Sequence, residues 1–486
     1  MNGMALNLFS SSEDLVEQAH YAISDLSRRA SKALSASTKT KYAQYFTEGV
    51  IAQAMSKRLT LSGDTLRIGD HGAGSGVLGA TTLVQLMSRH GRGALNLGAY
   101  EIDESLYAAF FDSMAIVEQF ACDSVSRLPT YTLSGDFTTT DLEVIKKRQN
   151  TLNGAVINPP YQKLNQSTDV AQFMKKHFVS VPNMYALFVV LTIDMLKDGG
   201  EMVAILPRSF MSGAYFKLFR RWLRQQGSID WFHRYKSRSN AFRGDNVLQE
   251  NILLKFVKGK PQAEQVEVSV SSGPEDKNCS CMTVKAIEIF SGNECGHMTL
   301  PCSLEELNSL TENSALPLDF DDLGLTVTTG KLEDFRYRDA LRYSASDRSL
   351  PVVYAQHWTS GEQQLAWSEN IVKPCYAKAT DDITKRTLER GNYVLVKRIS
   401  ANGDSNRCHS IALLEDANLP GDEWLIDNHV QVISSKNGLS KEQALRIQRH
   451  LSSHVVENVL RTKSGTTQLN KDDLRAIRFP ADCANH

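Results

Sequence analysis

The sequence predicts a doubly wound α/β sheet that is followed by a C-terminal domain of mixed α+β type. Between residues 65 and 206, short apolar stretches alternate with stretches of helical periodicity, which is typical of strands joined by helices. A turn with three glycines follows the first of these strands. After about residue 321 the pattern changes to short strand-like pieces, which indicates a second domain.

Each element follows from its own pattern of apolar residues. Two N-terminal helices are expected over residues 12–34 and 47–59. The alternating strands and helices then come in this order: 65–70, 77–89, 95–102, 105–120, 131–134, 155–157, 185–196 and 201–206. Later stretches are expected to form a strand (251–257), a loop (271–278), three short strands (325–327, 351–354, 392–398) and helices (441–461). We therefore divide the chain into residues 1–260, a connecting region 261–320 and residues 321–486.

The composition is that of a globular protein with two or three domains. The chain has 486 residues, of which 42% are hydrophobic. Its 54 Lys and Arg against 55 Asp and Glu give a net charge of -1, so a surface that binds nucleic acid must be local. No signal peptide and no apolar run of about 20 residues is evident, and we expect a cytoplasmic protein that does not enter membranes.

Eight cysteines are scattered along the chain, as expected for a protein of a reducing compartment. Cys279, Cys281, Cys295 and Cys302 lie near His297, and zinc would suit such side chains. Their spacing differs from the paired C-x2-C pattern of common structural sites. We therefore expect no metal, and zinc binding in this region is left open.

The first chemical motif is IGDHGAGSGVLG, residues 68–79. A strand that ends near Asp70, a glycine turn and a following helix would let backbone approach a ligand closely, with free N–H groups at the start of the helix. The spacing differs from the dinucleotide pattern G-x-G-x-x-G, so the turn alone is a weak signal. Its glycines are Gly72, Gly74 and Gly76.

Acidic residues follow the next two expected strands. Glu101 lies about where an acid would accept hydrogen bonds from ribose hydroxyls, and we favour it over the neighbouring Asp103. After the third strand, Asp136 offers an acceptor for an adenine amino group and Phe137 an aromatic ring for a base face. A plain Gly-Asp turn would give the same sequence.

The second chemical motif is INPPYQ, residues 157–162. Because proline fixes its own φ and restricts the residue before it, Asn158-Pro159-Pro160 predicts a stiff, extended corner. The Asn158 side-chain oxygen and the Pro159 carbonyl would both accept from one NH2 group and direct its lone pair at an electrophile. Tyr161 would stack on the ring that carries the amine.

These motifs together resemble gamma-class S-adenosylmethionine-dependent DNA adenine-N6 methyltransferases. Residues 38–47 (TKTKYAQYFT) are similar to the segment that precedes the glycine motif in that family. Residues 206–220, 240–252 and 464–480 resemble the PstI/BsuBI-type modification enzymes of type II restriction-modification systems, so the resemblance covers nearly the whole chain. His71 and Glu48 depart from the family, which often has proline at both positions, and put only the local loop shape in doubt.

The resemblance implies a Rossmann-like methyltransferase sheet, S-adenosylmethionine as cofactor, and two sets of site residues. Phe242 matches by position the aromatic residue that faces Tyr161 across the target base, with Phe210 as a rival. The implied catalytic residues are Asn158, Pro159, Pro160, Tyr161 and Phe242. The implied cofactor-binding residues are Tyr45, Thr47, Asp70, Gly72, Gly74, Gly76, Glu101, Ile102, Asp136, Phe137 and Asn158.

The resemblance also implies partners. The substrate would be double-stranded DNA with a specific target sequence, whose adenine is flipped out of the duplex. Residues 208–243 carry nine cations and one acid, which favours phosphate contact, although a solvated helix face would look similar. Residues 321–486 would be the target-recognition domain, with Arg336, Arg338, Lys397 and Arg398 as candidate base readers.

The expected enzyme is a monomer, and a companion endonuclease would act on the same site without stable binding. Three alternatives stay open at this point. The same motif serves protein glutamine-N5 methyltransferases and some RNA methyltransferases, because an amide nitrogen poses the same orbital problem. A non-enzymatic DNA-binding protein of this fold is the third.

Overall fold

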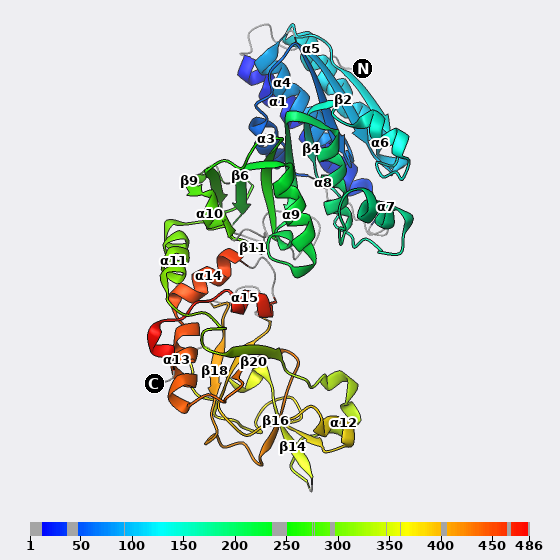
Figure 1. Cartoon of the computed structure of the whole chain (residues 1–486). Coiled ribbons are helices and arrows are strands. Elements are labelled where there is room, and N and C mark those ends of the chain that lie inside the picture. Colours follow the sequence, from blue (N-terminus) through cyan, green and yellow to red (C-terminus); the bar gives the residue numbers. More distant parts are fainter. Residues whose placement is uncertain are drawn as a thin grey trace. The chain divides into compact units, whose positions relative to one another are not determined.

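The computed structural model describes residues 12–35, 47–91, 93–235, 250–274, 276, 278–291, 297–346, 348–359, 361–399, 406–463 and 468–484. The chain forms two compact units, Met1–Met298 and Thr299–His486 (Figure 1). Each unit has its own hydrophobic core. The two units are described separately below.

A nine-stranded sheet forms the centre of the first unit. Its strand order is β3-β2-β1-β4-β5-β7-β6-β8-β9. The strands are β1 (Thr65–His71), β2 (Ala94–Tyr100), β3 (Thr130–Ser134), β4 (Leu152–Ile157), β5 (Leu196–Pro207), β6 (Gly227–Tyr235), β7 (Asn251–Lys258), β8 (Gln265–Ser271) and β9 (Ser280–Lys285). The strands β1 to β5 pair in parallel, and β7 runs antiparallel between β5 and β6.

The order of the parallel strands determines where a ligand can bind. From β1 the chain first extends the sheet through β2 and β3, and then continues on the other side of β1 through β4 and β5. The carboxyl ends of β1 and β4 are therefore neighbours, at the point where the strand order reverses. In open α/β sheets this edge is where ligands bind.

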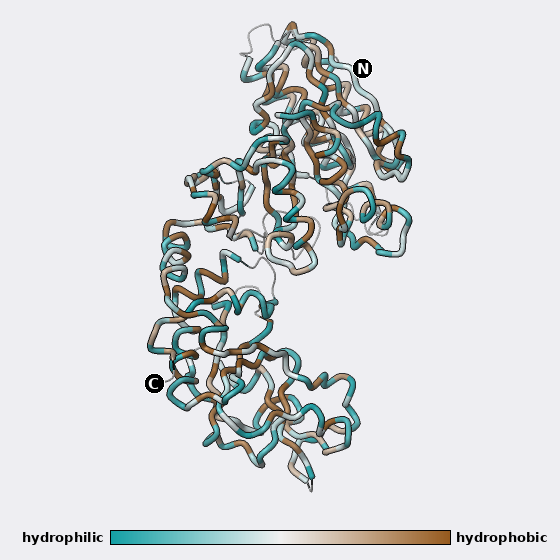
Figure 2. The backbone as a smooth tube through the Cα atoms, in the orientation of Figure 1, coloured by the Kyte–Doolittle hydropathy of each residue, from teal (hydrophilic) through white to brown (hydrophobic). Residues whose placement is uncertain are grey.

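Helices lie on both sides of the sheet (Figure 1). One set packs together and comprises α1 (Ser12–Ala33), α3 (Gly49–Arg58), α4 (Val77–His90) and α5 (Tyr107–Asp123). The other side carries α6 (Leu142–Arg148), α7 (Asp169–His177), α8 (Met184–Met195) and α9 (Lys217–Gln226). Ten of the twelve residues of α8 are buried, because this helix is apolar on all sides. Figure 2 shows hydrophobic stretches along the interior strands and helices.

The second unit contains two small sheets with helices packed beside them. The antiparallel sheet has the order β12 (Leu325–Thr329), β20 (Val430–Ser435), β17 (Tyr393–Lys397), β18 (Ser410–Leu413). The other has the order β13 (Leu341–Arg342), β15 (Tyr376–Lys378), β14 (Ser349–Val353), β19 (Glu423–Ile426), β16 (Leu388–Glu389). The helices are α11 (Leu304–Ala315), α12 (Asp381–Thr384), α13 (Lys441–Leu451), α14 (His454–Lys463) and α15 (Lys471–Arg475).

Residues 261–320, expected to connect two domains, are divided between the units. The strands β8 and β9 extend the sheet of the first unit, whereas α11 packs on α14 in the second unit. Most of this region is therefore regular structure. Among the described helices, none combines the length and the apolar character that a membrane span requires.

Candidate active site

The glycine turn lies between β1 and α4, and its backbone requires glycine. Gly72, Gly74 and Gly76 have φ of 86°, 56° and 81°, in the left-handed region that side chains disfavour. The Gly72 N–H donates to the Tyr100 carbonyl over 2.9 Å, which ties the turn to the end of β2. A Cβ on Gly76 would also lie 2.9 Å from the Phe110 ring. Around Gly74 a Cβ would meet no atom within 4 Å, so this part of the turn borders open space.

Asp70 binds the first turn of α4, directly after the glycine turn. Its side chain is completely buried, and Oδ2 accepts a hydrogen bond of 2.8 Å from the Gly79 N–H in the first turn of α4. Burial, together with the nearby Glu101 carboxylate, raises the pKa of Asp70 to about 7, although the hydrogen bond from Gly79 acts in the opposite direction. Asp70 does not line the cavity described below. Its position suits a support for the helix start more than a direct ligand contact.

Glu101 follows β2 and binds the glycine turn directly. Its Oε2 accepts from the Gly74 N–H over 2.7 Å, and Oε1 accepts from the Asp103 N–H over 2.8 Å. Burial raises the pKa of the Glu101 carboxyl, while these backbone donors act in the opposite direction. A carboxylate has about four lone-pair sites, so Glu101 can accept from a ligand hydroxyl in addition to these backbone donors.

Asp103, the competing carboxylate, has a different role. Its Oδ1 accepts from the N–H and the hydroxyl of Ser105, and so caps the short helix η1 (Glu104–Leu106). Glu101 lines the cavity and Asp103 does not. The geometry therefore favours Glu101 as the ligand-facing acid. Ile102, between the two, also lines the cavity and is 53% exposed.

Phe137, after β3, is held by an aromatic cluster. Its ring stacks on His71 with centroids 4.1 Å apart and planes 17° apart, and it contacts Tyr100 and Phe188 at angles of 60° and 50°. The His71 stack occupies one face of the ring. Next to it, Asp136 lines the cavity and accepts from the Thr138 N–H and hydroxyl, both over 2.8 Å.

His71 is a residue whose role sequence reasoning missed. It is completely buried, and its Nδ1 lies 2.7 Å from the Thr192 hydroxyl. Burial lowers the pKa of His71 to about 3, so the ring is neutral at physiological pH. His71, which departs from the proline that the family often has at this position, thus provides the ring on which Phe137 stacks. Nothing in the sequence brings residues 71 and 137 together.

The Asn-Pro-Pro-Tyr corner follows β4, beside the glycine turn. The Asn158 Nδ2 donates to the Thr47 hydroxyl over 3.0 Å, and its Oδ1 accepts from the Tyr161 hydroxyl over 3.0 Å. The Asn158 carbonyl oxygen lies 3.5 Å from where a Cβ on Gly72 would be. These contacts fix the amide with its nitrogen toward Thr47 and its oxygen toward Tyr161.

One cavity brings most of the predicted residues together. Those that line it are Thr47, Gly72, Gly74, Glu101, Ile102, Asp136, Phe137, Asn158 and Pro160. Lining residues that were not predicted are Ala73, Ser75, Val77, Leu78, Tyr100, Leu106, Gly135, Gln162, Met184 and Phe188. Most of these are apolar or small, and the sequence gives no signal that separates them from core positions. Tyr45 and Phe242 lie outside the described residues.

The other predicted residues lie close to this cavity without lining it, namely Asp70, Gly76, Pro159 and Tyr161. The rival aromatic, Phe210, is completely buried and packs edge-on against Phe219, with centroids 5.9 Å apart. It is a core residue in this structure, and its ring is not available to face Tyr161.

For two cations of the stretch 208–243 the expectation of phosphate contact is wrong, because their side chains are buried. Arg208 is buried in an ion pair of 2.8 Å with Glu250, and Arg220 is buried with Nη1 donating to the carbonyls of Phe210 and Gly213. Both serve the interior, because buried carbonyls and carboxylates need donors. Lys217 is exposed on α9. Lys236, Arg238 and Arg243 lie outside the described residues.

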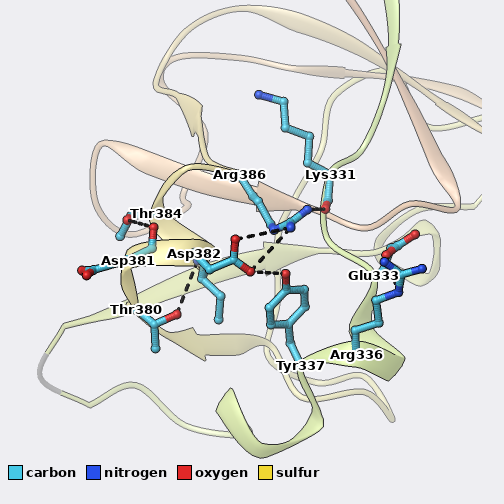
Figure 3. Close-up of polar contacts among 10 residues, drawn as sticks. Lys331, Glu333, Arg336, Tyr337, Thr380, Asp381, Asp382, Thr384 and Arg386 are labelled. Carbon is cyan, nitrogen blue, oxygen red and sulfur yellow. Dashed lines mark hydrogen bonds and ion pairs between the residues drawn. The ribbon is translucent and has the colours of Figure 1, made fainter.

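The candidate base readers of the second unit differ in accessibility. Lys397 is half-buried with its ammonium 5.4 Å from the Trp358 ring centroid, and Arg398 donates to the Asn428 carbonyl over 3.4 Å. Arg336 and Arg338 are exposed on the short helices η4 (Asp334–Arg336) and η5 (Arg338–Ala340). Figure 3 shows Arg336 among its neighbours.

The cysteine region forms no metal centre in the part of the chain that is described. Cys279 and Cys281 are exposed, and the Cys302 thiol lies 3.2 Å from Glu306 Oε1. No group of three or more His, Cys, Asp or Glu residues gathers in ligand geometry within the described ranges. Cys295 lies outside these ranges.

A parallel sheet edge with a glycine turn after β1, an acid after β2 and Asn-Pro-Pro-Tyr after β4 defines a class, the methyltransferases that use S-adenosylmethionine. Comparison with known proteins agrees. Residues 139–242 match the family described as Eco57I restriction-modification methylase. Over 455 residues the chain is 30% identical to the type II methyltransferase M.BsuBI of Bacillus subtilis. This match covers 91% of this chain and 88% of that protein.

The type II methyltransferase M.PstI of Providencia stuartii is likewise 30% identical over 465 residues, with 94% of this chain and 90% of that protein covered. The chain belongs to this family of type II restriction-modification methyltransferases. The resemblance to PstI/BsuBI-type modification enzymes is confirmed, and S-adenosylmethionine is the cofactor. A solved structure of the type ISP enzyme LlaGI with a DNA substrate mimic has a TM-score of 0.50 at 13% identity. This structural match covers 88% of this chain and 46% of that chain, and it indicates a similar fold and nothing more.

Proposed function

We propose that this DNA methyltransferase transfers the methyl group to N6 of an adenine that has been flipped out of its DNA duplex. The observation that carries the proposal is the position of Asn158. Its amide lines the same cavity as Gly72, Gly74 and Glu101, and its oxygen is fixed away from Thr47. An exocyclic amine placed there would meet an acceptor beside the cofactor.

The acceptors and the apolar surface that line the cavity suit S-adenosylmethionine. Glu101 offers lone pairs for ribose hydroxyls, Asp136 an acceptor for an adenine amine, and Ile102 an exposed apolar surface for a base face. Open space at Gly74 leaves room beside the backbone. When bound, the cofactor supplies an electrophilic methyl group on a sulfonium.

The chain's own residues would then hold the target amine. Asn158 Oδ1 and the Pro159 carbonyl would accept hydrogen bonds from its two N–H groups. These hydrogen bonds would strengthen as positive charge develops on the nitrogen. The Oδ1 atom also accepts from the Tyr161 hydroxyl, which orients the amide oxygen. Tyr161 contributes its ring face to the base. We assign no proton abstraction to Asp136.

The remaining parts of the chain complete this proposal. Strands β1 to β5 would form a doubly wound, Rossmann-like sheet, and residues 321–486 a target-recognition domain that selects the sequence. Flipping the base costs a few kcal/mol, which stacking and the amine bonds would offset. We propose that the enzyme acts as a monomer in the cytoplasm, and that a companion endonuclease shares its site without stable binding.

The test mixes the purified full-length protein with methyl-labelled S-adenosylmethionine and plasmid DNA that lacks methylated adenine. Digestion to nucleosides should place the label in N6-methyladenine. Asn158→Ala should reduce transfer by at least about 100-fold, since it removes a transition-state acceptor. Lys441→Ala, an exposed position of the second unit, should not. Label in cytosine would reject the adenine assignment, and label in protein or RNA but not DNA would reject the DNA substrate.

A further inference from the structure

A segment of the second unit, residues 332–338, is fixed to its surroundings at both ends. At its start, the buried Leu332 donates its N–H to the Ile426 carbonyl over 3.0 Å and accepts from the Asn428 N–H over 2.9 Å. Next to it, Asp334 pairs with Lys373 over 2.7 Å. We call residues 332–338 the clamped segment.

The far end of the clamped segment is held by α12 (Figure 3). The Tyr337 hydroxyl hydrogen-bonds to the Asp382 carboxylate. Arg386 lies with its guanidinium 5.2 Å from the Tyr337 ring centroid and its Nη2 3.4 Å from Asp382 Oδ1. Its Nη1 donates to the Lys331 carbonyl over 3.3 Å. Backbone and side chains therefore hold this short, irregular segment in one shape.

Between these fixed points the clamped segment presents two large side chains to solvent. Phe335 is 54% exposed, and the Arg336 side chain is 63% exposed. The Arg336 guanidinium lies 5.5 Å from the Phe335 ring centroid, and its Nε pairs with Glu333 Oε2 over 2.8 Å. An aromatic ring and an oriented guanidinium on a fixed backbone need little ordering when a partner binds.

The surroundings of the clamped segment suit a polyanion. Residues 331–343 and 381–386, together with Lys373, carry seven Lys or Arg and five Asp or Glu. Three of these acids, Glu333, Asp334 and Asp382, already contact a cation. The local excess of positive charge contrasts with the net charge of -1 for the chain. It complements DNA phosphates.

We propose that Arg336 is a specificity-determining residue that reads a guanine edge of the DNA target, with Phe335 packed against the neighbouring base or sugar. This inference rests on the proposed function. A guanidinium fork matches the O6 and N7 acceptors of guanine in the major groove. The clamp formed by Tyr337, Asp382 and Arg386 fixes the approach of that fork, and Glu333 orients it. Lys397 and Arg398 are only partly exposed, whereas the Arg336 side chain is 63% exposed, so Arg336 is the better placed reader.

The experiment first maps the methylated motif of the wild-type protein by sequencing treated plasmid DNA. The full-length Arg336→Ala and Arg336→Lys variants are then assayed on duplexes that differ from the motif at one base pair each. Both variants should lose preference at one G·C position by about 5- to 150-fold in kcat/KM, and keep it at the others. Glu333→Gln should show a smaller loss at the same position.

The matched control is Arg475→Ala, because Arg475 is an exposed arginine of the second unit with one acidic partner, Asp321, at 3.2 Å. It should leave the motif unchanged. An Arg336→Ala protein with an unaltered motif overturns the inference and leaves the proposed function intact. If Arg336→Ala lowers kcat/KM equally on all duplexes and Arg336→Lys restores it, Arg336 contacts phosphate and does not read a base. A wild-type protein that methylates no DNA overturns both proposals. Thermal melting of each variant identifies a folding defect. If the Arg336 variants do not fold, the loss of preference in the Glu333→Gln variant decides whether Arg336 reads the base.

Discussion

The His71 ring stacks on the Phe137 ring at 4.1 Å, and this pair connects the end of β1 to the wall of the cavity. Because His71 also bonds to Thr192 of α8, three parts of the first unit meet at one neutral imidazole. The pair gives the first prediction.

His71→Leu should weaken binding of S-adenosylmethionine by about 2- to 10-fold, since an aromatic pair contributes about 0.5–1.5 kcal/mol beyond its buried area. Titration calorimetry of cofactor binding measures the change. His71→Phe keeps an aromatic face and should retain more of the affinity. Equal affinities of the wild-type and His71→Leu proteins would show that the stack does not position Phe137.

Glu101→Gln should reduce cofactor affinity about 10- to 150-fold, because a hydrogen bond to a charged group contributes about 1.5–3 kcal/mol. The amide has one acceptor, so it cannot accept from both Gly74 and Asp103. The same titration measures the loss. Glu104→Gln, at an exposed acid three residues away, is the matched control. A similar effect of both variants would indicate general electrostatics.

Asp70 makes stability depend on pH. Its pKa is raised from 3.8 to about 7, so between these values only the folded state binds the proton. Stability should therefore fall as pH rises through this window, by up to about 1.4 kcal/mol per unit. Asp70→Asn removes this contribution. Hydrogen exchange of β1 and α4, compared between the two proteins at pH 5 and pH 7, measures it. An identical pH response in both would contradict the assignment.

Glu250→Gln should destabilise the first unit by about 3–5 kcal/mol, since it removes the negative charge that pairs with the buried Arg208 and the partly buried Arg234. Glu250 Oε1 lies 2.8 Å from Arg208 Nη1 and 2.7 Å from Arg234 Nε. Calorimetric melting of the full chain reports the loss. Glu267→Gln breaks the more exposed pair with Arg58 and should cost less than about 1 kcal/mol. Equal shifts for both variants would refute the difference in burial as the cause.

Local patterns determined what could be predicted. The glycine turn, Glu101 and the Asn158 corner each depend on a few adjacent residues whose geometry the sequence restricts. The helix expected over residues 185–196 is α8, Met184–Met195, because apolar periodicity reflects burial. Arg208 and Arg220 belong to the stretch expected to contact phosphate, yet both are buried, and the sequence alone could not show that these two arginines are exceptions to the usual exposure of charged residues.

Long-range contacts explain the rest. His71 supports Phe137 across 66 positions of chain, and the Thr47 contact with Asn158 spans 111. Apolar lining residues such as Leu78 and Phe188 have the same sequence character as core residues. Only the folded sheet decides which of them face the cavity.

The bond from Asn158 to Thr47 gives the amide a defined polarity. An asparagine side chain is nearly symmetric in shape, and rotation by half a turn exchanges an acceptor for a donor. With the hydroxyl of Thr47 accepting from the nitrogen, the proposed function has the oxygen accept from the incoming amine. In a chain with valine at position 47 this bond is lost, while the Tyr161 hydroxyl still donates to the amide oxygen. A single methyl-for-hydroxyl exchange at position 47 would thus weaken the orientation of the amide, and under the proposed function it would lower methyl transfer without altering the residues proposed to read bases.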